Sequence, residues 1–172
     1  MNTQTMNYAL PEKISENRVK FLKSKGIDSD IAELDLEMIK MKILNNDDGL
    51  VWNVEQCEDG EIEYKRFLTL NRHFPHPIYS IVPNKIMDTV WHYHILDTRA
   101  YVKDSEKIFG GYFHHFPYFG LRGKEDEKSL KDAFEKTKIL YENFFGDSMI
   151  RDSSSGCWHD CQSRCWHSCS SK

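Results

Sequence analysis

The sequence predicts a mainly α-helical protein, with about five helices packed as one irregular bundle and a flexible C-terminal tail. Apolar residues recur at three- and four-residue spacing in several segments, and clusters of Asn, Asp, Gly and Pro separate these segments. We find no convincing alternation of apolar and polar residues of the kind that indicates a half-buried strand. With 172 residues, 40% of them hydrophobic, the chain is long enough for one domain with its own core.

The composition divides the chain into four parts. A polar start is followed by a long body that holds nearly all of the apolar periodicity and is rich in histidine. A short segment rich in Ser and Gly then leads to a dense run of Cys, Trp and His. The predicted parts are a disordered N-terminus (1–10), a helical His-rich domain (11–146), a linker (147–156) and a tail (157–172).

The first helix is predicted to begin at Pro11, because proline is well suited to the first helical position, and to end at Gly26. Ile14, Phe21 and Leu22 fall on one side of it, so its apolar stripe is thin.

A second helix is predicted over residues 30–46, because Asp28-Ser29-Asp30 offers N-cap oxygens and Glu33 follows Asp30 by three residues, as in a capping box. The run of Asn, Asp and Gly at 45–49 ends it. Its buried stripe is predicted to contain Ile31, Leu34, Met38, Met41 and Leu44.

Three further helical regions follow, and each is bounded by residues that disfavour helix. The first of these regions has an uncertain start, because Asp59-Gly60 interrupts its pattern. An extended connection with three prolines separates it from the central helix. The predicted ranges are 50–70 for the third helix, 73–83 for the connection, 84–109 for the central helix and 125–145 for the last helix, which Gly146 ends.

The net charge of −4 argues against a general nucleic-acid binder, which needs a basic surface to meet phosphates. The N-terminus lacks the pattern of a signal peptide, and no apolar run reaches the ~20 residues of a membrane span. We therefore expect a cytoplasmic protein with no membrane partner and with reduced cysteines. The sequence also lacks a HExxH, GxSxG, P-loop or dinucleotide motif, so no organic cofactor is indicated.

Two histidine doublets, His92/His94 and His114/His115, lie within one stretch of 35 residues, from 83 to 117. Asp88 and His92 are four residues apart, which places them on one face of a helix. His94 lies roughly 200° round that helix from His92, so both cannot bind one ion unless the helix is broken.

The favoured metal ligands are Asp88 and His92, joined by His114 or His115 once the Gly110-Gly111 turn has reversed the chain. A carboxylate and imidazoles suit one transition-metal ion, with Zn, Fe and Cu as the candidates. His94 completes the set of candidate ligands, and His73 or His76 could add a further ligand. The alternative is a hydrogen-bonded aromatic core without metal, made of Trp91, His92, His94, Tyr101, His114 and His115.

The ordered run Asp88-x2-Trp91-His92-x-His94, followed by His114-His115-x-Pro117, resembles the glycine-rich-domain-containing-protein-like family. The resemblance covers roughly residues 52–117 and implies a helical module. The long glycine-rich extension of the plant members is absent here. The biochemistry of the family is poorly defined, so the resemblance bears on the fold more than on the function.

The tail contains the unit Cys-Trp-His-x-Cys twice, eight residues apart, whereas the body contains only Cys57, for which a buried inert thiol is expected. Sixteen residues cannot bury a core, so folding does not explain two tryptophans there. The candidate tail residues, for modification or for metal binding by thiolates, are Cys157, Trp158, His159, Cys161, Cys165, Trp166, His167 and Cys169.

A folded domain, a spacer and a short Cys-rich end resemble the layout of precursors of ribosomally made, post-translationally modified peptides. The leading hypothesis is such a precursor, whose domain presents the tail to modifying enzymes and whose product a protease or exporter then releases. A copper- or zinc-handling protein is the first alternative. Pairing of the tail cysteines as disulfides is another interpretation of the tail. The last alternative is a metalloenzyme with an incidental tail, or one that acts on its own tail, and the sequence favours a substrate or metal-binding role over turnover.

Overall fold

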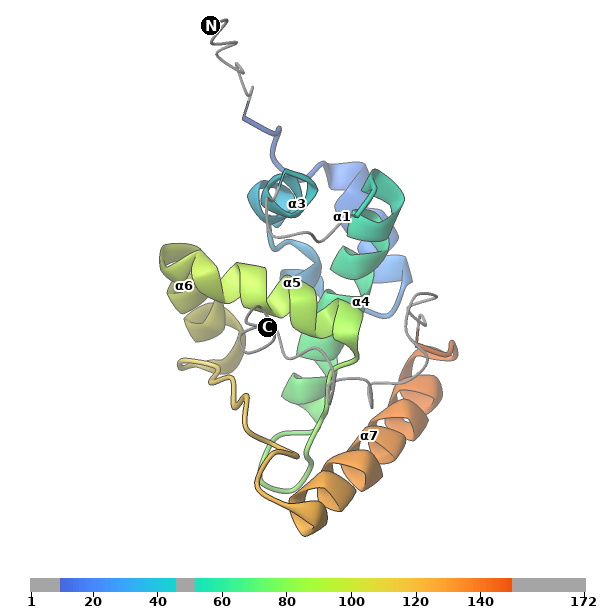
Figure 1. Cartoon of the computed structure of the whole chain (residues 1–172). Coiled ribbons are helices and arrows are strands. Elements are labelled where there is room, and N and C mark those ends of the chain that lie inside the picture. Colours follow the sequence, from blue (N-terminus) through green and yellow to red (C-terminus); the bar gives the residue numbers. More distant parts are fainter. Residues whose placement is uncertain (1–9, 46–51, 150–172) are drawn as a thin grey trace, which may run out of the picture.

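The computed structural model describes residues 10–45 and 52–149, which form an all-α protein (Figure 1). These ranges contain seven helices and no strand, which confirms the predicted fold class. The helices are α1 (Glu16–Ser24), α2 (Ser29–Ala32), α3 (Glu37–Leu44), α4 (Val54–His73), α5 (Lys85–Leu96), α6 (Thr98–Phe109) and α7 (Lys124–Phe145).

Helix α4 is the central element, and it packs against α2, α3 and α5 (Figure 1). All of its residues from 60 to 70 except Ile62 are buried, as expected of a helix enclosed by the core. The helix continues through Asp59-Gly60, contrary to the predicted interruption. A Cβ at Gly60 would lie 2.8 Å from the ring of Trp52, so glycine here allows a close approach of an aromatic side chain.

Two of the predicted helices are each divided in two. The second predicted helix is broken between α2 and α3, so Met38 and Leu44 of the predicted stripe are exposed, while Ile39 and Ile43 are buried. The expected capping box is wrong, because Asp28 is the N-cap residue of α2 and Glu33 lies at its C-terminal end.

The central helix is broken at Asp97, whose side chain accepts a hydrogen bond from the backbone N–H of Ala100 and caps α6. Asp97 therefore both ends α5 and begins α6. An internal N-cap of this kind is possible because aspartate can bond the backbone N–H three residues further on.

Helix α1 begins after Ser15 instead of at Pro11. The Ser15 side chain accepts a hydrogen bond from the N–H of Arg18, which is the stronger start signal. Of the predicted stripe, Leu22 is buried, whereas Phe21 is 41% exposed.

A buried ionic network joins α4 to α1 and α3. Glu61 and Lys65 are both fully buried and lie 2.7 Å apart. Arg18 and Lys40 reach the same Glu61 carboxylate at 2.8 and 3.3 Å. Lys65 also donates to two backbone carbonyls at the end of α2, so every charge in the network has several partners.

Helix α7 lies at the predicted position and ends at Gly146, which has a positive φ of 75°. It is held to α4 through the Tyr141 hydroxyl, which donates to Glu63 and accepts from Arg66. Met149, the last described residue, is 9% exposed and belongs to the core. No helix among the described residues has the length and apolar character that crossing a membrane requires.

Candidate metal centre

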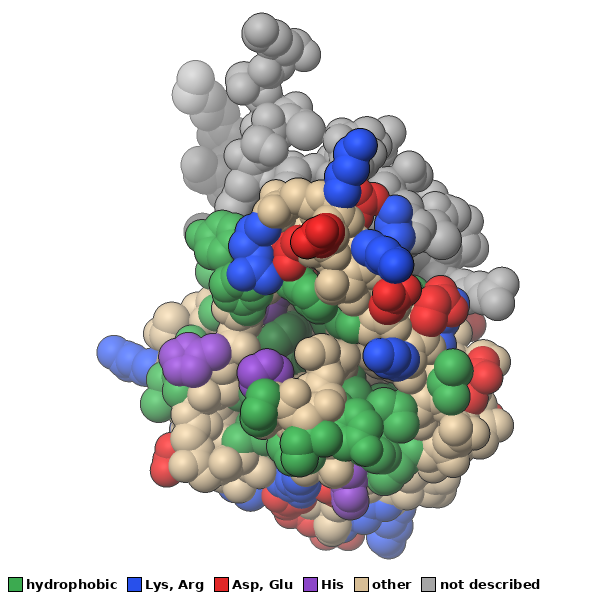
Figure 2. All heavy atoms as spheres, turned by 90° about the horizontal axis from the view of Figure 1, so that it is seen from below, with side chains coloured by type: hydrophobic (Ala, Val, Ile, Leu, Met, Phe, Trp, Pro, Cys, Tyr) green, Lys and Arg blue, Asp and Glu red, His purple; other side chains and the backbone are tan. Residues whose placement is uncertain are grey.

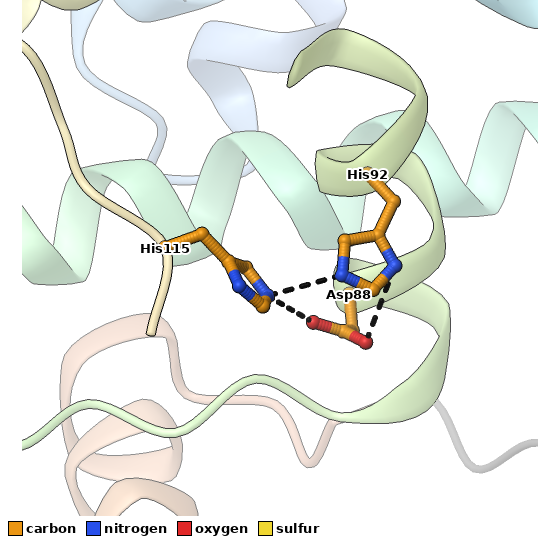
Figure 3. A group of neighbouring side chains, drawn as sticks. All are labelled: Asp88, His92 and His115. Atoms are coloured by element: carbon orange, nitrogen blue, oxygen red, sulfur yellow. Dashed lines mark hydrogen bonds and ion pairs between the residues drawn. The ribbon is translucent and has the colours of Figure 1, made fainter. Parts of the chain in front are cut away.

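Three of the predicted ligands lie together at the surface of the helical domain (Figure 3). Asp88 and His92 come from α5, and His115 comes from the segment that follows α6. The ligand atoms of all three lie within 4.8 Å of one another. The Nε2 atom of His115 is 3.1 Å from the Nε2 atom of His92 and 3.1 Å from Asp88 Oδ1. Nδ1 of His92 is 3.7 Å from the other Asp88 oxygen.

The first two ligands share a helix face because they are one turn apart on α5. Asn84 caps the start of the helix, and its side chain accepts a hydrogen bond from the N–H of Met87 at 2.8 Å. The amide nitrogen of Asn84 also lies 3.3 Å from Glu63 on α4, so the start of α5 is tied to the central helix. This fixes the direction in which Asp88 and His92 point.

The third ligand reaches α5 because the chain reverses after α6. Gly110 ends α6 with a φ of 71°, a conformation that glycine adopts without strain. The following segment is extended and its side chains alternate: Tyr112 and His114 are exposed, whereas Phe113 and His115 are half-buried. The alternation therefore turns His115 toward α5 and His114 toward solvent.

Aromatic packing holds this segment in place. Phe113 stacks on Trp91 and on Phe109, with ring centroids 5.0 and 4.4 Å apart. The Trp91 ring lies 4.4 Å from that of His115. Aromatic pairs contribute more stabilising free energy than their buried area alone would give. These contacts therefore hold the segment at a fixed distance from α5.

A hydrogen-bond chain adds a second restraint. The Trp91 indole N–H donates to the Tyr101 hydroxyl at 2.8 Å, and that hydroxyl donates to the backbone carbonyl of Phe113. Burial raises the pKa of Tyr101 to about 12, so the hydroxyl keeps its proton at neutral pH. Tyr101 thus anchors the backbone two residues before His115.

Replacing Tyr101 by phenylalanine is expected to weaken metal binding about 10-fold, since removing a group that orients a ligand costs 10- to 100-fold in affinity. The variant keeps the aromatic ring but loses the bond to the Phe113 carbonyl. Competition with a fluorescent chelator measures the change. Tyr112→Phe removes a hydroxyl from an exposed neighbour and should bind as the parent does. If the Tyr101→Phe variant bound metal as tightly as the parent, the Tyr101 hydroxyl would not be needed to position His115.

Two of the separations between the ligand atoms suit a metal ion. Two atoms that each bind an ion at ~2.0–2.1 Å lie ~2.9 Å apart at a right angle and ~3.4 Å apart at the tetrahedral angle. Both 3.1 Å separations at His115 Nε2 fall between these limits. A hydrogen-bonded cluster uses the same distances, but the single proton on that nitrogen must then serve two acceptors.

Within the part of the chain that the structure describes, one side of the site is open to solvent. The side chains of His92, Asp88 and His115 are 42, 26 and 16% exposed. Catalytic zinc sites have three protein ligands and one open position, whereas structural zinc sites have four protein ligands. An ion here would therefore keep room for water or for another ligand.

The other predicted ligands lie elsewhere. His94 is buried: its Nε2 donates to Asp104 at 3.2 Å, and its Nδ1 accepts from the Tyr64 hydroxyl at 3.0 Å. Both ring nitrogens are thus engaged inside the domain. His114 is exposed, with its ring against Tyr112.

His73 lies 3.1 Å from Asp28, and His76 is exposed in the connection before α5. The partner of His94, Asp104, was missed from the sequence, because it lies on α6 beyond the unexpected helix break. The role of Tyr101 was also missed.

Cys57 is buried, and burial raises the pKa of its thiol to about 11, as expected of an inert thiol. All eight candidate residues of the tail, from Cys157 to Cys169, lie outside the described residues.

One comparison with known proteins finds a match. A family model described as UCP032817-like matches residues 33–143, which is more than half of the chain and includes Asp88, His92 and His115. No curated protein and no solved structure matches the chain.

Proposed function

The chain belongs to the UCP032817-like family, and we propose that it binds one divalent transition-metal ion through Asp88, His92 and His115. The observation that carries the proposal is the convergence of two imidazoles and a carboxylate within 4.8 Å. Two histidines and one carboxylate form a ligand set that suits zinc and non-haem Fe(II), and imidazole also accepts copper.

The construction around the site supports the proposal. The two segments that meet there are held by the Asn84 cap, by the Tyr101 bond to the Phe113 carbonyl and by ring packing on Trp91. Metal sites depend on such support, because ligands held in place lose less freedom on binding.

Equilibrium dialysis against Zn²⁺, Co²⁺ and Cu²⁺, followed by elemental analysis, tests the proposal. The full chain with all four tail cysteines changed to serine removes metal binding by tail thiolates. We expect it to keep one equivalent of metal and to lose it when His92 is also changed to alanine. A chain without tail thiolates that binds no metal would refute the proposal.

A second candidate function is that of a precursor whose tail is modified by partner enzymes. The twin Cys-Trp-His-x-Cys units favour it, since one enzyme acting twice explains a repeat of rare residues. The repeats lie beyond the range that the family model matches, as expected if the tail has a role of its own. Intact-mass measurement after co-expression with neighbouring genes tests it, and a tail that always keeps its unmodified mass would exclude it.

The relation to the glycine-rich-domain-containing-protein-like family stays a prediction, as does the alternative in which the tail handles copper or zinc. The dialysis experiment separates the latter from the proposed site. Metal buffering by the tail would appear as further equivalents, lost when the four cysteines are changed to serine.

A further inference from the structure

We propose that the metal centre holds iron, and that Trp91, Tyr101 and Tyr112 form a path along which an electron moves from the protein surface to that iron when a peroxide oxidises it. We call these three residues the aromatic relay. The inference rests on the proposed metal site and adds a reaction class, the one-electron oxidation of a surface tyrosine.

The aromatic relay begins at a metal ligand and ends in solvent. The centroid of the Trp91 ring lies 4.4 Å from that of His115. The Trp91 indole N–H donates to the Tyr101 hydroxyl at 2.8 Å. The Tyr101 and Tyr112 ring centroids are 5.3 Å apart, and Tyr112 is 47% exposed. Direct contacts between aromatic residues therefore connect the ligand His115 to the surface.

The residue types of the relay suit electron transfer. Apart from sulfur-containing side chains, tryptophan and tyrosine lose an electron most readily, whereas the phenylalanine ring holds its electrons much more tightly. Phe67 and Phe113 also pack on Trp91, with ring centroids 5.0 Å away in both cases. The residues in contact from His115 to solvent are nevertheless a tryptophan and two tyrosines, which are the types that can pass an electron.

The hydroxyl partners decide where the radical comes to rest. A tyrosine that has lost an electron forms a stable radical only when its proton also leaves. The Tyr101 hydroxyl donates to the Phe113 carbonyl, which is a weak base, and burial raises the pKa of Tyr101 to about 12. Tyr101 therefore keeps its proton and acts as a bridge. The exposed Tyr112 can release its proton to water, so the radical ends there.

The ligand set favours iron as the redox ion. Two histidines and one carboxylate with open positions are the ligands of non-haem Fe(II) enzymes, whereas zinc has no redox chemistry. The His92 side chain is 42% exposed, so a small oxidant can reach the ion. Figure 2 shows histidines exposed on one face of the domain, beside hydrophobic side chains, the class that includes tyrosine. One-electron chemistry of this kind is typical of non-haem iron.

The step balances with hydrogen peroxide as the oxidant. Its O–O bond takes up two electrons and breaks. One electron comes from Fe(II), which becomes Fe(III), and the other comes from Tyr112 through the relay. One oxygen becomes hydroxide, and the other takes up a proton in place of the one that Tyr112 releases and leaves as water. The products are Fe(III), hydroxide, water and the neutral phenoxyl radical of Tyr112.

Electron paramagnetic resonance after rapid freezing tests the relay. The full chain, with all four tail cysteines changed to serine so that no tail thiol reacts, receives one equivalent of Fe(II) without oxygen and then one equivalent of hydrogen peroxide. We expect a radical signal that narrows when the protein contains ring-deuterated tyrosine, which assigns it to tyrosine. The Tyr112→Phe variant should lose this signal.

Three further variants complete the design, each compared at its measured iron content. Tyr118→Phe is the matched control: it removes another exposed tyrosine, whose ring contacts Phe116, and should keep the signal. Trp91→Phe keeps an aromatic ring at this position but not an oxidisable one, so the yield of the radical per bound iron should fall. His92→Ala removes a metal ligand and should give no tyrosine radical.

The remaining outcomes separate the relay from the metal site. Iron bound without a tyrosine radical, or a signal that persists in Tyr112→Phe, would overturn the relay and leave the site intact. An unchanged yield in Trp91→Phe, or a signal that persists in His92→Ala, would also overturn it. A protein that binds Zn²⁺ but not Fe(II) would contradict the relay alone, and one that binds neither would refute the metal site itself.

Discussion

Replacing His115 by alanine is expected to lower the affinity of the domain for Zn²⁺ or Co²⁺ by more than about 100-fold. Its Nε2 atom lies 3.1 Å from an imidazole nitrogen of His92 and 3.1 Å from the Asp88 carboxylate. Without it, the two remaining ligands come from a single turn of α5, and the segment after α6 no longer takes part. Isothermal titration with the four tail cysteines changed to serine measures the loss.

His114→Ala is the matched control, because it removes the same side chain one position earlier. His114 is exposed and lies outside the ligand group, so its loss should leave the affinity within about two-fold of the parent. Equal losses of metal affinity in the two variants would contradict the assignment of His115, rather than His114, as the metal ligand. Thermal unfolding of both variants in the absence of metal checks that the fold is kept.

Replacing Glu61 by leucine is expected to destabilise the domain by about 3–5 kcal/mol, because it leaves the buried Lys65 ammonium without its carboxylate partner. The side chains of Glu61 and Lys65 are both fully buried, and Lys40 also loses a partner. Chemical denaturation of the metal-free protein gives the change in the free energy of unfolding.

The control is Glu58→Leu, which removes a carboxylate from the same network at a side chain that is 35% exposed. Its loss should change the free energy of unfolding by about 1 kcal/mol or less, since exposed ion pairs contribute little. Similar losses for the two variants would mean that burial does not set the strength of this network.

Glu61 also makes the stability depend on pH. Burial in itself raises the pKa of Glu61, but the charges of Lys65, Lys40 and Arg18 outweigh it and hold the pKa below its usual value. A carboxylate of this kind stabilises the folded state above the unfolded pKa of ~4.3, and its contribution is lost as the pH falls through the folded pKa. The difference in stability between the parent and Glu61→Gln should therefore be largest near neutral pH and shrink in acid, and a constant difference would contradict the assigned pKa direction.

The strongly periodic parts of the fold were predictable from the sequence. Helix α7 ends at a glycine, as predicted, and it lies within one residue of the predicted range. The helix breaks were not predictable in the same way. Asp97 sits inside a continuous helical pattern, and only its side-chain bond to the N–H of Ala100 decides that a new helix begins there.

The candidate site was predictable up to the choice of histidine. The four-residue spacing of Asp88 and His92 placed both on one helix face. The choice between His114 and His115 depends on the phase of an extended segment, and Phe113 sets that phase by packing against Trp91 and Phe109. The alternation of Phe113 and His115 is visible in the sequence, but its direction follows from a contact between distant segments.

The central claim is that Asp88, His92 and His115 hold one metal ion, and anomalous X-ray scattering from crystals of the protein grown with Zn²⁺ tests it most directly. We predict one peak at the zinc edge, ~2.0–2.2 Å from an atom of each of the three side chains. A structure that contains zinc elsewhere, with His92 and His115 joined only by a hydrogen bond, would contradict the claim.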